Sequence, residues 1–241
     1  GMASLSAARP RGWGDVSPET ATAQMRGGGD EPLYDSISPA VFPSTTYARS
    51  PDLSYPKGRC YSRDDNPTVE PAERALASLE GGGEALLFAS GSAAAVAVFR
   101  ALRPGDHAVI PGVMYWGLRL WVKTFCESYG IALSTIPMEG RDTAPLEAAL
   151  AAPPAGAAPG GRTLVWLETP ANPTWTVVCI RSFAEASHRT PDTVVAVDST
   201  AATPVLTRPL ALGADVVMHS ATKYLNGHSD VLAGALVCAE G

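Results

Sequence analysis

Short apolar runs alternate with helical segments from about residue 70 to residue 238, and this alternation constrains the fold more than any other feature. The runs are almost free of polar residues, which is typical of strands buried on both faces of a parallel sheet. Repeated strand–helix units predict a layered α/β protein with a mostly parallel sheet. We expect strands at 85–89, 107–111, 131–136, 164–168, 194–198, 216–219 and 232–238. We expect helices at 71–80, 91–100, 118–129, 144–152 and 181–188.

The residues before this region have a different composition. The stretch to about Thr46 is rich in Gly, Ser and Pro, with three consecutive glycines at 27–29. Such a composition predicts an extended arm that docks on another surface. We therefore predict an arm segment at 1–68 and one large domain at 69–241. The chain ends at Gly241 directly after an expected strand, so we expect it to be a piece of a longer protein.

Composition excludes several classes of function. The 241 residues are 46% hydrophobic and 17% charged, which is enough apolar material for a sizeable core. The net charge of −6 offers no basic face for a nucleic-acid backbone. No apolar run approaches the ~20 residues of a membrane-spanning helix. We therefore expect no nucleic-acid partner and no membrane partner, but a small phosphorylated ligand needs only a local site.

The four cysteines are far apart in the sequence, at positions 60, 126, 179 and 238. This spacing is unlike that of a zinc knuckle or a dithiol redox site. Scattered cysteines and an N-terminus without an apolar signal segment predict reduced thiols and a cytoplasmic location. The four histidines also lack the spacing of metal ligands, and we expect no metal site.

Three polar groups follow three different expected strands. Lys223, flanked by hydroxyl side chains, comes just after strand 216–219, and Asp198 ends strand 194–198. Ser90 and Gly91 join strand 85–89 to a helix, whose first N–H groups can bind a phosphate. Each has a plain alternative: a surface lysine, a capping aspartate and a simple turn. Because ligands gather at the carboxyl ends of parallel strands, the three together favour one cofactor site.

Two further residues follow expected strands. Tyr115 comes after strand 107–111, where an aromatic ring can stack on a cofactor. Asn172 comes after strand 164–168 and precedes Pro173, so a hydrogen-bonding role and a simple turn both remain open.

Five segments of the chain resemble the Cys/Met-metabolism family of pyridoxal-phosphate enzymes. That family includes the cystathionine γ-synthases, the cystathionine β- and γ-lyases and methionine γ-lyase. The matches run in the family's order from about Ser38 to the end of the chain. They are YSRDDNPT at 61–68, SG at 90–91, ETPANP at 168–173, VD at 197–198 and SATKYLNGHSD at 220–230.

The resemblance implies the aspartate-aminotransferase-like fold, which is fold type I of the pyridoxal-phosphate enzymes. Its mostly parallel sheet is sandwiched by helices, and 69–241 would be the cofactor-binding large domain with the C-terminal domain missing. Segment 1–68 would include residues that reach a neighbouring subunit. The smallest active unit would be a dimer, and the family is commonly a tetramer.

The resemblance also assigns a role to each matching residue. Lys223 would bond covalently to pyridoxal phosphate and then move protons, Asp198 would pair with the ring nitrogen, and Tyr115 would stack on the ring. Asn172 would contact the ring hydroxyl or the substrate carboxylate. The remaining implied contacts are to the phosphate: from Gly91, Ser92, Ser220 and Thr222, and in a neighbouring subunit from Tyr61 and Arg63.

The chain departs from the family pattern at several places. Ser92 stands where the family usually has Met, which leaves the backbone N–H unchanged. Trp116-Gly117-Leu118 also differs from the sequence usual after Tyr115. The arginine that binds the substrate carboxylate belongs to the family's C-terminal domain, and no residue of this chain can be given that role.

The resemblance implies an enzyme acting on small sulfur amino acids by γ-replacement or by β- or γ-elimination. The segment after Lys223 slightly favours a cystathionine γ-synthase-like reaction over the lyase reactions of cystathionine β-lyase or methionine γ-lyase. Two alternatives of other classes remain, a non-catalytic cofactor-binding remnant and an assembly subunit. Transamination is a weaker alternative within the enzyme class.

Overall fold

The computed structural model describes residues 38–240. The chain divides into two compact units, 1–79 and 80–241, and each is described by itself. Most of the predicted arm, including the glycines at 27–29, lies outside the described residues. The predicted boundary between 68 and 69 stays a prediction.

The described part of the N-terminal unit is mainly loop and ends within helix α2 (Glu70–Glu80), whose last residue is counted in the second unit. A single antiparallel bridge pairs Thr46 with Tyr61. Arg59 forms ion pairs with both Asp65 and Glu70, each at 2.5 Å. These ion pairs connect the loop to the first turn of α2.

A seven-stranded sheet forms the centre of the second unit, in the order β1-β7-β6-β5-β4-β2-β3. The pairs among β2, β3, β4, β5 and β6 are parallel, whereas β7 is antiparallel to both of its neighbours. The mostly parallel sheet is therefore confirmed. The strands are β1 (Glu84–Phe88), β2 (His107–Pro111), β3 (Ala132–Ile136), β4 (Thr163–Glu168), β5 (Thr193–Asp198), β6 (Val216–His219) and β7 (Gly234–Cys238).

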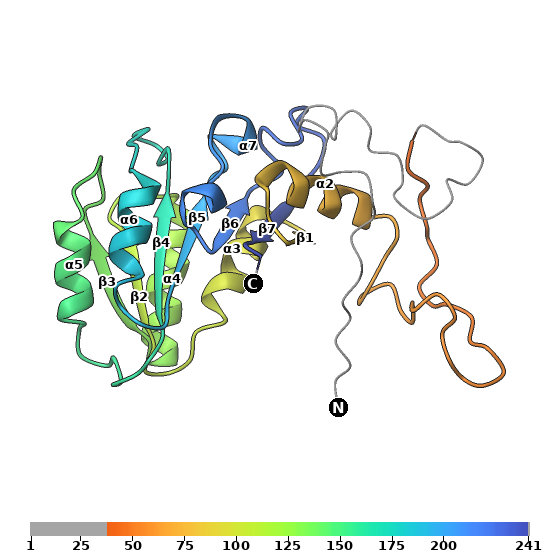
Figure 1. The fold of residues 1–241 in the computed structure, drawn as a ribbon, viewed down its shortest axis with the longest axis horizontal. Helices are drawn as coiled ribbons and strands as arrows, with labels where there is room; N and C mark the ends of the chain where they lie inside the picture. The colour runs from red at the N-terminus through yellow and green to blue at the C-terminus, as the bar shows by residue number, and fades with distance from the viewer. Residues whose placement is uncertain (1–37, 241) are drawn as a thin grey trace. The chain divides into compact units, whose positions relative to one another are not determined.

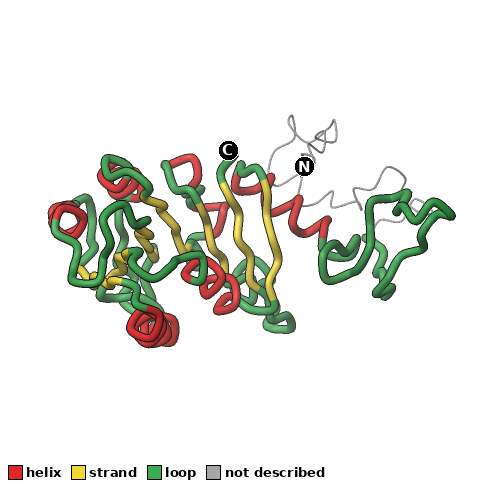
Figure 2. The backbone as a smooth tube through the Cα atoms, turned by 90° about the horizontal axis from the view of Figure 1, so that it is seen from below, coloured by secondary structure: helices red, strands yellow, loops and turns green. Residues whose placement is uncertain are grey.

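Helices cover both faces of this sheet (Figures 1 and 2). Helices α3 (Gly91–Phe99) and α4 (Trp116–Tyr129) pack over one core, which contains Ala108, Leu164 and Trp166. Helices α5 (Ala144–Ala151) and α6 (Ile180–Ser187) pack over the other. Successive strand residues alternate between the two cores, which explains why the strand sequences are apolar throughout.

The segment between β5 and β6 differs from the expectation. It contains a short helix, α7 (Thr203–Leu206), and a 3₁₀ turn, η2 (Leu210–Leu212). Both are too short for an apolar period to show in the sequence. The other expected helices and strands are present, with ends that differ by one or two residues.

All four cysteines are free thiols. Within residues 38–240, no helix is both long enough and apolar enough to cross a membrane.

Candidate active site

A cavity of about 1080 Å³ opens at the carboxyl ends of the parallel strands. Its walls come from the loops after β4, β5 and β6 and from the first residues of α3 and α4. The sheet reverses its winding between β2 and β4, and such a switch point is where α/β sheets form their binding crevices. The cavity brings together the predicted residues Gly91, Ser92, Tyr115, Asn172, Asp198, Ser220, Thr222 and Lys223.

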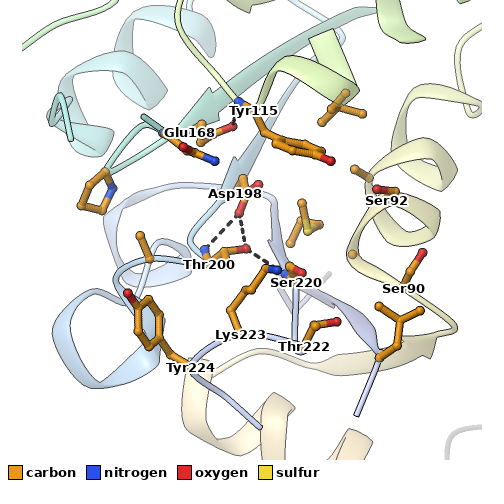
Figure 3. Close-up of a pocket in the computed structure, with 18 of the residues that line it drawn as sticks. Ser90, Ser92, Tyr115, Glu168, Asp198, Thr200, Ser220, Thr222, Lys223 and Tyr224 are labelled. Atoms are coloured by element: carbon orange, nitrogen blue, oxygen red, sulfur yellow. Dashed lines mark hydrogen bonds between the residues drawn. The ribbon is translucent and has the colours of Figure 1, made fainter. Parts of the chain in front are cut away.

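Asp198 is buried at the end of β5, and its contacts with Thr200 define the floor of the cavity. Oδ1 accepts hydrogen bonds from the Thr200 backbone N–H (3.0 Å) and from the Thr200 hydroxyl (2.6 Å). The Thr200 hydroxyl oxygen in turn accepts a bond from the Ser220 N–H at 2.8 Å, which ties the loops after β5 and β6 together (Figure 3). Burial raises the pKa of Asp198, while the Thr200 hydrogen bonds and the charge of His219 lower it. A cationic ring nitrogen would supply the partner that a buried carboxylate needs.

Helix α3 begins against the loop that carries Lys223. Ser90 caps the helix, because its hydroxyl accepts the Ala93 N–H at 3.1 Å. A Cβ atom on Gly91 would lie 2.5 Å from the Ser220 Cβ, and one on Gly234 would lie 2.1 Å from the Ser90 carbonyl oxygen. Only glycine allows these approaches, which hold the N-terminus of α3 beside Ser220. The free N–H groups and the helix dipole there suit a phosphate.

Lys223 is exposed and lines the cavity beyond the end of β6. Its backbone N–H donates to the Ser220 carbonyl at 3.0 Å, which fixes the turn that presents the side chain. The neighbouring Thr222 hydroxyl donates to the Ala233 carbonyl and accepts the Ala233 N–H, both at 3.0 Å. A phosphate contact through that hydroxyl would require it to turn away from Ala233.

Tyr115 immediately precedes α4 and turns its ring toward the cavity (Figure 3). A Cβ atom on Gly117 would lie 3.0 Å from the end of this ring, so glycine leaves the space that the ring occupies. In Figure 3 the Tyr115 ring and Lys223 lie on opposite sides of Asp198. A flat ring bonded to Asp198 could therefore lie against Tyr115.

Glu168, at the end of β4, is a site residue that the sequence analysis did not single out. It pairs in register with Asp198, and its two oxygens accept the backbone N–H groups of Tyr115 (2.8 Å) and Asn172 (2.7 Å). Burial and then the charge of Asp198 raise the pKa of Glu168 to about 7, against these two hydrogen bonds. The signal that marked Asp198, an acid closing an apolar strand, also marks Glu168.

Thr200 is the second site residue that the sequence alone did not indicate. An Asp followed two positions later by Thr is a short turn pattern, and it could have indicated the bonds that Thr200 makes to Asp198.

Tyr61 and Arg63 belong to the N-terminal unit. The Arg63 guanidinium lies 4.9 Å from the centre of the Tyr61 ring, and its side chain is exposed. Their predicted contact with a phosphate in a neighbouring subunit stays a prediction.

The histidines have structural contacts. His107 begins β2 and contacts Ser134, and His188 follows α6 and pairs with Asp215. His219 is fully buried and bonds to Glu80 at 2.5 Å. Within the described part of the chain, no group of three or more His, Cys, Asp or Glu side chains could hold a metal ion.

Comparison with known proteins shows the family to which the chain belongs. The family model described as "Cys/Met metabolism PLP-dependent enzyme" matches residues 20–241. Cystathionine gamma-synthase of Mycobacterium tuberculosis (strain ATCC 25618 / H37Rv) is 40% identical over 210 residues, which are 86% of this chain and 51% of that protein. Human cystathionine gamma-lyase is 37% identical over 216 residues, or 89% of this chain and 51% of that protein. The chain thus spans about half the length of the curated relatives it matches.

A crystal structure of cystathionine gamma synthase from Xanthomonas oryzae pv. oryzae, in complex with cystathionine, superposes with a TM-score of 0.81. It is 33% identical, and the match covers 94% of this chain and 55% of that one. This match confirms the predicted fold. The chain belongs to the Cys/Met metabolism family of enzymes that depend on pyridoxal phosphate (PLP).

Proposed function

We propose that this chain forms the PLP-binding part of an enzyme that acts on sulfur amino acids. The observation that carries the proposal is the joint placement around one cavity of Lys223, the buried Asp198 and the N-terminus of α3. When bound there, PLP supplies an electrophilic carbon for an amine and a ring that withdraws electrons from the bonds next to that amine.

The residues around the cavity would bind the cofactor, orient its ring and move protons. Asp198 holds the ring nitrogen protonated, because a buried carboxylate and a cation stabilise each other. The first N–H groups of α3 hold the phosphate, and Tyr115 covers one face of the ring. Lys223 would hold PLP through Nζ, and the same Nζ would accept and return protons at the reacting carbons of the substrate.

Within this chemistry we propose γ-replacement of the cystathionine γ-synthase kind, with β- or γ-elimination as the alternative. The segment after Lys223 supports this choice, and both a cystathionine gamma-synthase and a cystathionine gamma-lyase are among the relatives. The two reactions give different products. A γ-replacement with cysteine yields a thioether, whereas elimination releases ammonia and a keto acid.

A non-catalytic role is the second candidate, and one observation favours it. No arginine lines the cavity among the described residues, so its walls offer no guanidinium for a bidentate contact with the substrate carboxylate. In this role the chain would bind PLP or complete a partner subunit without turning over substrate. We also propose that the active form is at least a dimer, in which Tyr61 and Arg63 reach the phosphate of a neighbouring subunit.

The test is the intact mass of the protein incubated with PLP, measured with and without borohydride. Reduction should add one PLP per chain, and peptide mapping should place it on Lys223. K223A should take up none at this position, while K123A, which alters an exposed lysine in α4, should behave as the wild type. A wild-type protein without an adduct on Lys223 would refute PLP binding.

Activity is measured on the same preparations. Formation of cystathionine, or release of ammonia and keto acid, would distinguish replacement from elimination. An adduct without either product would favour the non-catalytic role.

A further inference from the structure

Glu168 lies where the backbone pairing between two central strands has stopped. The β2–β4 ladder ends at Val109–Val165, whereas β4 stays paired with β5 as far as Glu168–Asp198. Beyond Val109 the chain of β2 leads through Gly112 to Tyr115, one wall of the cavity. The carboxylate of Glu168 therefore stands at the gap that opens at the switch point of the sheet.

One oxygen of Glu168 bonds across this gap, and the other bonds to the loop that follows β4. Oε2 accepts the N–H of Tyr115 at 2.8 Å, and Oε1 accepts the N–H of Asn172 at 2.7 Å. The first bond places a carboxylate at the N-terminus of the 14-residue helix α4, where the helix dipole favours negative charge. Tyr115 is the N-cap residue and makes no capping bond through its own side chain; Glu168, from a different strand, accepts its N–H as the N3 carboxylate of a capping box does.

Burying a carboxyl group at this position costs free energy, which is unexpected for a residue that only supports the fold. Glu168 is 7% exposed and lies beside the buried Asp198, and both its burial and that neighbour raise its pKa. The carboxylate accepts two hydrogen bonds from backbone N–H groups, each with a donor–acceptor distance below 2.9 Å. These bonds offset part of the free-energy cost of burying the charge. The two residues that it holds are the ones whose side chains stand at the proposed ring site.

We propose that Glu168 is a positioning residue, whose carboxylate fixes Tyr115 and Asn172 on two walls of the cavity and so sets how they meet the PLP ring. The proposal rests on the proposed function, because the ring in question is that of PLP. Glu168 does not touch the reacting atoms. It acts through the backbone of the two residues that it binds.

The variant E168Q tests this role with almost no change of shape. Glutamine keeps one acceptor oxygen but presents an NH₂ group in place of the second, so one of the two backbone N–H groups faces another donor. In the protein without PLP, amide exchange measured by NMR should accelerate about tenfold at Tyr115 or Asn172, and less at Val165 in the middle of β4.

With PLP added, E168Q should bind about tenfold more weakly. The visible circular dichroism of each bound PLP should also fall, because this signal depends on how the ring is held. L146A is the matched control, since Leu146 is fully buried in α5, belongs to the core on the other face and does not line the cavity. It should lower stability without changing the dichroism of bound PLP.

Unchanged exchange at both amides in E168Q would overturn the proposal. The proposal would also be overturned if L146A lowered the visible circular dichroism of each bound PLP as much as E168Q does. If the wild type takes up no PLP, the proposed function fails, and exchange without the cofactor still decides whether Glu168 holds the two loops.

Discussion

Glu168 and Asp198 are two acids at the ends of neighbouring strands, and burial raises the pKa of both. A carboxyl whose pKa is raised by folding binds its proton more tightly in the folded state. Such a group contributes stability that is fully present below its unfolded pKa and lost as the pH rises through its folded pKa. For Glu168 this window runs from 4.5 to about 7.

This direction of the pH dependence gives a prediction for the stability of the protein without PLP. Between about pH 4.5 and pH 7.5 the wild type should lose stability relative to E168Q, because the variant has no group to titrate at this position. Asp198 remains in both proteins, but its charge acts on Glu168, so the difference between the two proteins reports the loss of this coupled pair. Urea unfolding across this pH range is the measurement. E147Q, at an exposed position in α5, should keep the pH dependence of the wild type, and the same behaviour in E168Q would contradict the prediction.

At the scale of elements, the site depends on how closely α3 approaches the loop after β6. Gly91 begins the helix and Gly234 begins β7, and neither has room for a side chain. The approach puts the helix N-terminus, with its unpaired N–H groups, next to Ser220. The proposed phosphate site would therefore arise from the contact of two elements that are more than a hundred residues apart in the sequence.

Gly91→Ala should disturb this contact. The new Cβ would lie 2.7 Å from the Ser220 Cα, so the helix or the loop must shift. We expect a loss of stability of ~1–3 kcal/mol and PLP binding weaker by at least about tenfold. The measurements are urea unfolding and titration with PLP.

Gly112→Ala is the matched control, because its Cβ would meet only the Ile136 carbonyl oxygen, at an ordinary 3.7 Å. It should bind PLP as the wild type does. Equal PLP affinity in both variants would show that the close approach at Gly91 does not matter for binding.

At the scale of the whole molecule, a buried hydrogen bond joins residues 139 positions apart. His219 ends β6 and Glu80 ends α2, and both belong to the second unit. Their side chains are fully buried, with Nε2 and Oε1 2.5 Å apart. Neither His219 Nδ1 nor Glu80 Oε2 has a hydrogen-bond partner in the described residues. Each therefore depends on the other for the bond that offsets its burial.

A double-mutant cycle with E80M and H219L, which remove the hydrogen-bonding groups and keep apolar volume, tests this dependence. Each single change should cost ~2–3 kcal/mol, because it leaves the other group buried without its partner. The double variant should cost less than the sum by ~1–3 kcal/mol. Urea unfolding of the four proteins gives these values. Strictly additive losses would mean that the two side chains do not stabilise each other.

The sequence by itself determined the layered sheet and predicted the residues of the proposed cofactor site. Strands buried on both faces must be apolar throughout, and acids or lysines that close such strands must meet at one edge. Lys223, Asp198 and Gly91 could therefore be placed together from their spacing alone. The antiparallel direction of β7 and the short helix α7 could not, because neither leaves a period in the sequence.

Only the tertiary structure decided how these residues are held. The Glu168 carboxylate accepts a hydrogen bond from the backbone N–H of Tyr115, 53 positions away. The Thr200 hydroxyl accepts one from the backbone N–H of Ser220, 20 positions away. A backbone N–H is present at almost every residue, so the sequence carries no mark of which one a buried side chain will bind. That choice follows from the register of β4 against β5 and from the gap beyond the β2–β4 ladder, both of which arise when the chain packs.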